Sequence, residues 1–307
     1  MPLPPKLYFK LQQLKNSLRQ AFGLKEESYD TTYRMCPSCR ALIDRKASTC
    51  PMCGARVGGA RSRPSRTPGR VAGILPAPTS ANTVVIIFSV ILYIISWVLT
   101  QRAASASLQS APALGGISGG VLVELGAKGP WIFAGQYWRL VTAIFLHGGL
   151  LHIGFNMWVL YDVGPMVESL FSGPKYIVMY LATGVFGFIV SALWSPFGIS
   201  IGASGAIVGL IGVLIGASFH LGSMGRELRQ RLWIYVIYVV ILVFLPIFHI
   251  DNAAHFGGFI AGLLLGYLLP TGEPQTRGGE NLWNTLAVIS VLIIAGSFGL
   301  MALNLAR

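Results

Sequence analysis

The longest stretch of this chain without a formal charge covers residues 176–225, and it constrains the fold more than any other feature. A helix needs about 20 apolar residues to cross a bilayer, so this stretch is long enough for two spans. Residues 194–198 include serine, proline and glycine, which predicts a break between the two. Only 11% of all residues are charged, whereas soluble domains carry about 25%. We therefore expect an all-α, polytopic membrane protein.

Seven apolar segments are long enough to be membrane spans, and the basic residues around them predict an orientation. The segments are residues 83–100, 150–166, 175–193, 204–219, 232–248, 252–269 and 282–303. Of the 23 lysines and arginines, 14 precede residue 71, and three more arginines lie in the turn expected at residues 222–231. Basic residues stay on the cytoplasmic side, so we expect a cytoplasmic N-terminus and an external C-terminus. This accounts for the basic N-terminal segment without nucleic acid, which we do not expect as a partner.

All four cysteines of the chain lie in two C-x-x-C pairs within residues 34–58. Cys36 and Cys39 form the first pair, and Cys50 and Cys53 form the second. Two such pairs can place four thiolates around one cation, so we expect a structural Zn²⁺ in a small zinc ribbon with four cysteine ligands. An iron site or two disulfides are the alternatives, although a reducing cytoplasm disfavours disulfides. The protein partner of this module is unknown.

The rest of the chain divides by composition into four further segments. Residues 1–30 carry leucines at helical spacing among lysines. They predict a basic amphipathic helix that lies on an anionic membrane surface or docks on the cysteine module. Residues 59–80 are rich in Gly, Arg, Pro and Ser and predict a flexible basic linker. Residues 81–270 are expected to form a core of six transmembrane helices, and residues 271–307 a loop and a seventh helix.

The fourth span is expected to begin at a serine between glycines, in the sequence Gly202-Ala203-Ser204-Gly205. Such a turn leaves room beside the hydroxyl and places free backbone N–H groups next to it, as a nucleophile with an anion site requires. Small residues of this kind also serve simply to pack membrane helices together. The motif alone does not distinguish a catalytic nucleophile from a packing contact. A nucleophile would also need a nearby base as its partner, which one of the other spans must supply.

A histidine at the start of the sixth span supplies that partner. In the predicted topology Ser204 and His255 both lie at the external ends of their spans, at similar depth. Both spans carry repeated glycines, which lets the two backbones approach closely enough for a hydrogen bond. An intramembrane histidine is costly and usually functional, although one that merely binds a carbonyl at the interface is the alternative. Asp251 precedes this span and is interpreted as its helix cap.

Further polar residues lie at the entrance of the second span. His152 and Asn156 are four residues apart and share one helix face. Both can donate hydrogen bonds to an oxyanion beside the serine. His147 comes five residues before His152, and we expect it to brace the loop.

These motifs together resemble the rhomboid intramembrane serine proteases over roughly residues 80–270. The matching patterns are His147-x4-His152-x3-Asn156, Gly202-x-Ser204-Gly205 and Ala254-His255-x-Gly-Gly258-x3-Gly262, joined by Trp138-Arg139 and Gly164-x3-Glu168. The resemblance implies a rhomboid-like bundle of six core helices plus a C-terminal seventh. It implies that Ser204 is the nucleophile and His255 the general base, with no third carboxylate. It further implies an oxyanion hole of His152, Asn156 and the Ser204 backbone N–H, and structural support from His147, Gly202, Gly205, Trp138, Arg139 and Glu168.

The resemblance predicts a serine endopeptidase of a bacterial inner membrane that cleaves transmembrane proteins near the external face, without a cofactor for catalysis. One residue departs from the pattern: Val208 occupies a position where many bacterial members carry an aromatic residue. A catalytically inactive binder of membrane clients is the alternative function, and the presence of both Ser204 and His255 argues against it. A transporter would need charged groups within the spans. The only acid found there is Asp162, for which the sequence offers no specific role.

Overall fold

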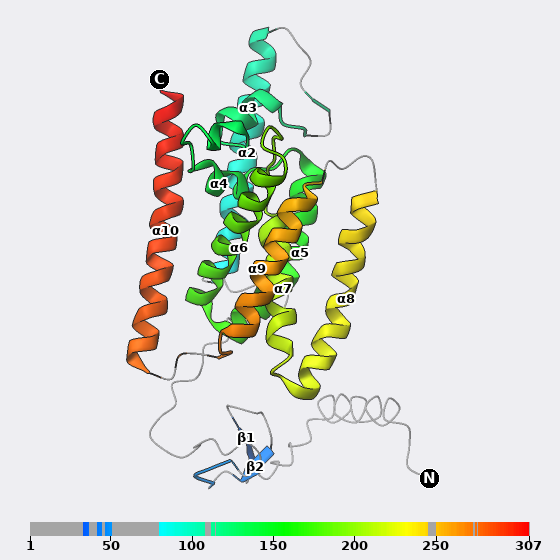
Figure 1. Cartoon of the computed structure of the whole chain (residues 1–307), viewed down its shortest axis with the longest axis vertical. Helices are drawn as coiled ribbons and strands as arrows, with labels where there is room; N and C mark the ends of the chain where they lie inside the picture. The colour runs from blue at the N-terminus through cyan, green and yellow to red at the C-terminus, as the bar shows by residue number, and fades with distance from the viewer. Residues whose placement is uncertain are drawn as a thin grey trace, which may run out of the picture. The chain divides into compact units, whose positions relative to one another are not determined.

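A computed structural model describes residues 33–36, 42–44, 47–50, 80–107, 112–113, 115–244, 250–272, 274 and 276–306. The chain divides into two compact units, Met1–Arg66 and Thr67–Arg307. Figure 1 shows the whole chain coloured from the N-terminus to the C-terminus. The amphipathic helix predicted at residues 1–30 lies outside the described residues, as does the predicted linker up to residue 79.

The first unit contains a two-stranded antiparallel sheet whose strands flank the first cysteine pair in the sequence. Strand β1 (Tyr33–Met35) pairs with β2 (Leu42–Asp44), so that Tyr33 lies opposite Asp44. Cys36 directly follows β1, and both Cys36 and Cys50 are buried. Cys39 and Cys53 lie outside the described residues, and within those residues no group of three or more metal-binding side chains is found. The zinc site therefore stays a prediction.

The second unit is all-helical within the residues that the structure describes. Its long helices are α2 (Ala81–Ser107), α5 (Leu150–Phe171), α6 (Gly173–Trp194), α7 (Ser204–Ser218), α8 (Gly222–Phe244), α9 (Asn252–Leu268) and α10 (Arg277–Leu305). Short helices fill the connection between α2 and α5, namely α3 (Gly119–Glu124), η1 (Pro130–Ile132), α4 (Arg139–Thr142) and η2 (Ala143–Phe145). Each predicted span overlaps one of the long helices.

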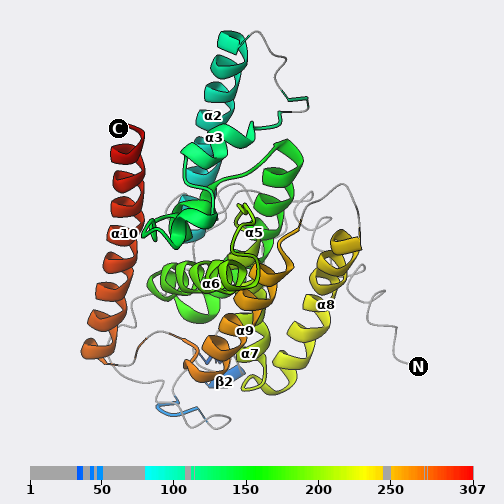
Figure 2. The ribbon, with the colours of Figure 1, turned by 45° about the horizontal axis from the view of Figure 1, so that its top comes forward.

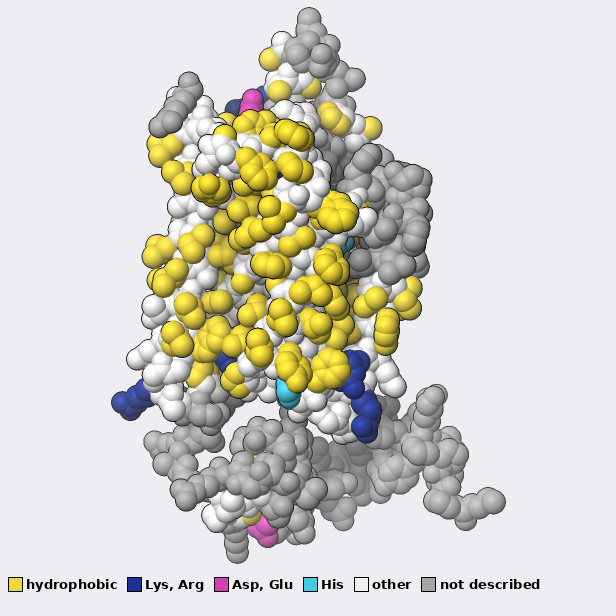
Figure 3. Space-filling model, in the orientation of Figure 1, with side chains coloured by type: hydrophobic (Ala, Val, Ile, Leu, Met, Phe, Trp, Pro, Cys, Tyr) yellow, Lys and Arg dark blue, Asp and Glu magenta, His cyan; other side chains and the backbone are white. Residues whose placement is uncertain are grey.

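Within the described residues, three helices are long and apolar enough to cross a membrane: α2, α6 and α10. A fourth candidate is the pair formed by residues 139–145 and α5, which is bent by 90° at the break between its two parts. Helices α7 and α9 are apolar but shorter. Hydrophobic side chains cover most of the face shown in Figure 3, and dark-blue basic side chains are seen near the lower end of the helices. The exact number of spans stays a prediction.

Among the predicted spans, the fifth differs most from its helix, because α8 begins ten residues before the predicted start. The sequence predicted a basic turn at residues 222–231 and a span from residue 232 onwards. Instead, the arginines of this segment belong to the first turns of α8, which begins at Gly222. The prediction of a turn was wrong because Arg, Glu, Leu and Gln are good helix formers, and residues 226–231 contain no helix breaker.

Helices α7 and α9 run side by side and touch through their backbones (Figures 1 and 2). A Cβ atom added to Gly258, Gly262 or Gly266 of α9 would overlap a carbonyl oxygen of α7. The carbonyls concerned belong to Gly205, Gly209 and Val213. The predicted close approach of the two glycine faces is therefore confirmed. It brings together the N-terminal ends of both helices, where Ser204 and His255 lie.

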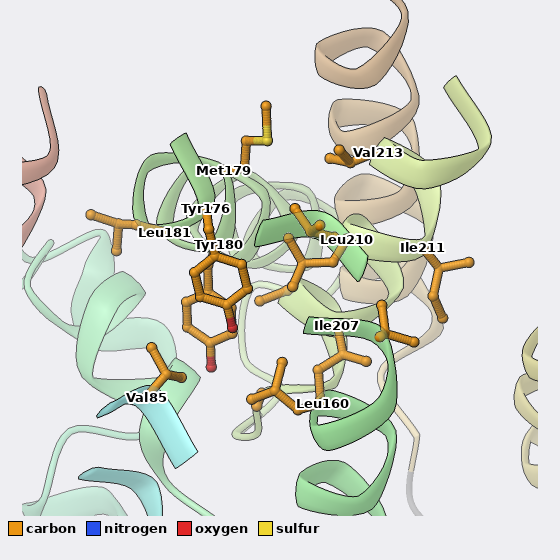
Figure 4. Packing of buried hydrophobic residues seen from close by; sticks show 14 of the residues in the cluster. Val85, Leu160, Tyr176, Met179, Tyr180, Leu181, Ile207, Leu210, Ile211 and Val213 are labelled. Atoms are coloured by element: carbon orange, nitrogen blue, oxygen red, sulfur yellow. The ribbon is translucent and has the colours of Figure 1, made fainter. Parts of the chain in front are cut away.

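The hydrophobic core lies mainly between α5, α6 and α7, and Ala254 is the buried residue that α9 adds to it. Figure 4 shows Tyr176 and Tyr180 of α6 near Leu160 of α5 and Ile207 of α7, with Val85 of α2 at the edge. The two tyrosine rings are stacked, with centroids 6.1 Å apart. Burial of so many large side chains holds α5, α6 and α7 in fixed relative positions, because a close-packed interior resists displacement.

Asp162, which the sequence left without a role, joins α5 to α8. Its carboxylate accepts a hydrogen bond from the hydroxyl of Tyr235 and lies 3.9 Å from the guanidinium of Arg231. The Arg231 and Asp162 side chains are 65% and 41% exposed, so the ion pair is screened and adds little stability. Asp162 thus connects α5 to α8. It lies on neither of the helices that carry Ser204 and His255.

Candidate active site

A hydrogen bond joins the first residue of α7 to an early residue of α9. The Oγ of Ser204 lies 2.7 Å from Nε2 of His255. Both residues are partly buried. A serine hydroxyl so close to an imidazole nitrogen can lose its proton to that nitrogen as the oxygen attacks an electrophile. The structure therefore brings together the two residues that the sequence singled out on separate spans.

The turn before Ser204 depends on a glycine. Gly202 has a φ of +124°, a conformation that side-chain-bearing residues rarely adopt. A Cβ atom at this position would also lie 2.7 Å from Nε2 of His152. The Gly202 N–H donates to the carbonyl of Ala143 at 2.9 Å, which ties the turn to η2. Gly202 is therefore required both by the backbone conformation and by the space that His152 occupies.

The start of α9, which carries His255, is fixed by Asp251. One oxygen of the Asp251 carboxylate accepts from the backbone N–H of Ala254 at 2.9 Å, and the other accepts from the hydroxyl of Ser191. The prediction that Asp251 caps this helix is confirmed. Among the described residues, Nδ1 of His255 has no hydrogen-bond partner. The pair thus differs from a Ser-His-Asp triad, in which a carboxylate accepts from this nitrogen.

His152, in the first turn of α5, presents a hydrogen-bond donor toward the turn before Ser204. Its Nδ1 accepts from the backbone N–H of Gly148 at 3.3 Å. A neutral imidazole that accepts at Nδ1 carries its proton at Nε2. Nε2 is the atom that would be 2.7 Å from a Cβ at Gly202, so this N–H faces the approach to Ser204.

Asn156 provides a second donor one helical turn further along the same face of α5. Its side chain is 8% exposed, and its Nδ2 has no hydrogen-bond partner within the described part of the chain. The same Nδ2 would lie 3.8 Å from a Cβ at Gly202. A buried amide without a partner is costly. Asn156 is thus suited to bind an acceptor that arrives between α5 and α7.

His147 supports this arrangement from the segment that precedes α5. Its side chain is fully buried, its Nδ1 is 3.2 Å from the carbonyl oxygen of Phe145, and its ring packs edge-on against His152 at 5.1 Å between centroids. These contacts hold the bend between η2 and α5, where the backbone turns by 90°. A residue that braces the loop would make such contacts, and this role of His147 stays a prediction.

Trp138 and Arg139 organise the segment between α3 and α4. The Arg139 guanidinium packs over the rings of both Trp131 and Trp138, 4.7 Å and 4.6 Å from their centroids. It also donates to the carbonyls of Val123 at 2.7 Å and Ala127 at 3.1 Å. Arg139 is 3% exposed. A buried guanidinium with these partners holds the loop in one conformation.

Glu168 lies at the other end of α5, away from Ser204. Its carboxylate accepts from the backbone N–H of Ala81 at 2.8 Å and so caps the start of α2. Gly164, one turn earlier on α5, has no room for a Cβ because the Asn82 side chain packs against it. The motif Gly164-x3-Glu168 therefore joins α5 to α2 and supports the bundle rather than the site.

Sequence reasoning missed one residue near the site, Lys128. It lies between α3 and η1, its side chain is 1% exposed, and its ammonium donates to carbonyls at the end of α6. Burial lowers the pKa of Lys128, and the nearby charge of Asp251 raises it in part. The only available signal was a lone lysine in a region with few charges, which by itself predicts nothing about its contacts.

Comparison with known proteins identifies the class. The family model of the rhomboid domain matches residues 134–271, which include the helices that carry Ser204 and His255. The relative YdcA of Bacillus subtilis (strain 168), a rhomboid by its name, is 32% identical over 136 residues, or 44% of this chain and 68% of YdcA. The chain belongs to the rhomboid family, and it is a multi-pass integral membrane protein.

Two further relatives match over a smaller share of their own length. The rhomboid protease GluP of Bacillus subtilis (strain 168) is 35% identical over 178 residues, which are 56% of this chain and 34% of GluP. RHOMBOID-like protein 5 of Arabidopsis thaliana is 36% identical over 140 residues, 44% of this chain and 45% of that protein. The matched regions thus span less than half the length of these two relatives.

Proposed function

We propose that this protein is an intramembrane serine endopeptidase that uses a dyad of Ser204 and His255. The observation that carries the proposal is the 2.7 Å separation of Ser204 Oγ and His255 Nε2. In this mechanism the Oγ attacks the carbonyl carbon of a peptide bond while its proton passes to Nε2. The protonated His255 then gives the proton to the leaving amine, and an acyl-enzyme remains. Water, deprotonated by His255, releases the second product.

The developing oxyanion would be bound by three donors. We assign Nε2–H of His152, Nδ2–H of Asn156 and the backbone N–H of Ser204 to this role. The first two face the turn at Gly202, and an amide in the first turn of a helix has no intrahelical acceptor. Donors that are already in position stabilise the charged transition state without a cost of reorganisation.

The substrates would be transmembrane proteins of the bilayer in which the enzyme lies. We place the cleavage near the external face, with a cytoplasmic N-terminus and an external C-terminus. Arg226, Arg229 and Arg231 lie at the opposite end of the bundle from Ser204, which supports this orientation by the positive-inside rule. A substrate helix must unwind locally to expose its carbonyl, so span ends of weak helix propensity are favoured.

Removal of a donor from the oxyanion hole tests the function directly. We expect Asn156→Ala to lower kcat by roughly 10²-fold with KM changed by less than about twofold, because the lost hydrogen bond forms only in the transition state. Initial rates on a model transmembrane substrate in liposomes measure both parameters. A control is Asn284→Ala, which changes an exposed asparagine of α10, a helix that carries none of the assigned residues. An unchanged kcat for Asn156→Ala would remove it from the oxyanion hole, and a wild-type protein that binds the substrate without cutting it would indicate a client binder.

We also propose that the four cysteines bind one structural Zn²⁺. The described part of the module fits this, because Cys36 directly follows β1 and both Cys36 and Cys50 are buried. Thiolates of Cys36, Cys39, Cys50 and Cys53 would be the ligands. Metal analysis of the purified full chain should find about one zinc per protein, and Cys50→Ser should lose it. A full-length protein that contains no zinc and has all four thiols oxidised would favour disulfides instead.

A further inference from the structure

A single buried lysine holds the loop that leads into α7. The Nζ of Lys128 donates to the carbonyl oxygens of Ser195 at 2.8 Å, Gly198 at 3.0 Å and Ser191 at 3.3 Å. An ammonium has three N–H donors, so these three acceptors satisfy it completely. The Ser191 and Ser195 carbonyls also accept from the backbone N–H groups of Ser195 and Gly198. The C-terminal end of a helix carries partial negative charge, which favours a cation at this end of α6.

The backbone of Lys128 extends the same contact toward Ser204. Its N–H donates to the carbonyl of Ser200 at 2.9 Å, and its carbonyl accepts from the Ser200 N–H at 3.0 Å. Ser200 is four residues before Ser204. Between them Gly202 is tied to Ala143, as described above. The loop before α7 is therefore held by the side chain and the backbone of Lys128, together with the hydrogen bond from Gly202 to Ala143.

A second chain of contacts leads from the same lysine to His255. Ser191, whose carbonyl accepts from Lys128, donates its own hydroxyl to the carboxylate of Asp251. Asp251 caps α9, and its carbonyl accepts from the N–H of His255 at 3.1 Å. Lys128 and Asp251 also attract each other electrostatically. The Lys128 ammonium thus contacts both the loop that precedes Ser204 and the residue that binds the helix cap of α9, which carries His255.

We infer that Lys128 is a positioning residue, which sets the distance between Ser204 and His255 through the loop before α7 and through Ser191 and Asp251. The inference rests on the proposed protease function. Lys128 makes no contact with Ser204 or His255 among its hydrogen bonds, so it acts through other residues. A reacting oxygen must stay near its base to within a fraction of an ångström, so a loop displaced by about 1 Å can slow the reaction about 10²-fold.

The other end of α6 offers a matched control. Lys175 is also 1% exposed, and its Nζ donates to the carbonyls of Pro270 and Gly272, each at 2.9 Å. It lies in the first turn of α6, whereas Lys128 binds the last turn. The 22 residues of α6 separate the two sites by roughly 30 Å. Loss of either ammonium removes hydrogen bonds to backbone carbonyls that are at least partly buried, but only one of the two sites adjoins the Ser204–His255 pair.

The test compares Lys128→Met with Lys175→Met in the full chain, in liposomes, below the unfolding temperature of both. Three quantities are measured: the unfolding midpoint, the rate at which a fluorophosphonate labels Ser204, and kcat and KM for a model transmembrane substrate. We expect both variants to lower the midpoint. Only Lys128→Met should slow labelling and kcat, by about 10- to 100-fold, with KM within about twofold. Lys175→Met should label at close to the wild-type rate.

Ser191→Ala provides a milder variant if Lys128→Met does not fold. It removes the hydroxyl that donates a hydrogen bond to Asp251 and leaves the backbone carbonyl that accepts from Lys128. We expect a several-fold loss of labelling rate and kcat. Wild-type labelling in a folded Lys128→Met or Ser191→Ala protein would overturn the positioning role and leave the protease assignment standing. A wild-type protein that is folded but neither labelled nor active would overturn both.

Discussion

Replacing Ser204 with alanine should lower peptide-bond cleavage by this protein by about 10⁴-fold or more. The hydroxyl is the attacking group in the proposed mechanism, and its loss leaves only binding and the oxyanion donors to assist the reaction. His255→Ala should cause a loss of similar size, because no described residue other than His255 forms a hydrogen bond with Ser204 Oγ. Cleavage of a transmembrane substrate by purified protein in liposomes measures both effects. The double variant should be no worse than either single one, since the pair acts as a unit.

Matched controls separate this prediction from damage to the fold. Ser290 lies on α10, where its hydroxyl donates to the Leu286 carbonyl at 2.8 Å. His220 lies beyond the other end of α7, 3.0 Å from the Tyr267 carbonyl oxygen. Ser290→Ala and His220→Ala should keep cleavage within about threefold of the wild type, as substitutions away from special features usually do. Undiminished cleavage by folded Ser204→Ala protein would exclude Ser204 as the nucleophile.

The meeting of Ser204 and His255 could be predicted because each signal is local and the topology is constrained. A serine between glycines and a histidine followed by glycines both stand out in apolar spans. Charge placement then puts both at the same end of the bundle. The glycine repeats predict that the two helices touch. These three signals together were enough for a pair that is 51 residues apart in the sequence.

The supports of the pair could not be predicted in the same way. Lys128 binds backbone carbonyls that lie 63, 67 and 70 residues away. Every residue has a carbonyl, so no pattern of side chains marks the acceptors. The contact of Asp162 with Tyr235 likewise depends on how α8 packs, and the sequence sets no rule for that. The prediction of a turn at residues 222–231 was wrong for a different reason. Arginines are as compatible with an exposed helix as with a turn, and the residue types of this segment favour a helix.

Gly262→Ala should destabilise the protein strongly, although alanine is the better helix former by about 1 kcal/mol. A Cβ at Gly262 would overlap the carbonyl oxygen of Gly209, so α7 and α9 must move apart. Overpacking of this kind costs typically about 1–3 kcal/mol, and rigid backbone on both sides leads us to expect a value near the upper end. The unfolding midpoint in detergent should fall by roughly 5–10 °C. Gly296→Ala on α10 is the control, because no atom lies within 4 Å of its added Cβ.

The position of the glycine along α9 then separates stability from catalysis. Gly258 packs against the carbonyl of Gly205, next to Ser204, whereas Gly266 packs against Val213 two turns further along. Alanine at either position should lower the unfolding midpoint by a similar amount. At temperatures where both variants are folded, Gly258→Ala should lose at least about 10-fold more cleavage than Gly266→Ala, because it displaces the ends of the helices that hold Ser204 and His255. Equal activities would mean that the pair tolerates a shift between α7 and α9, and that the glycine contact serves packing alone.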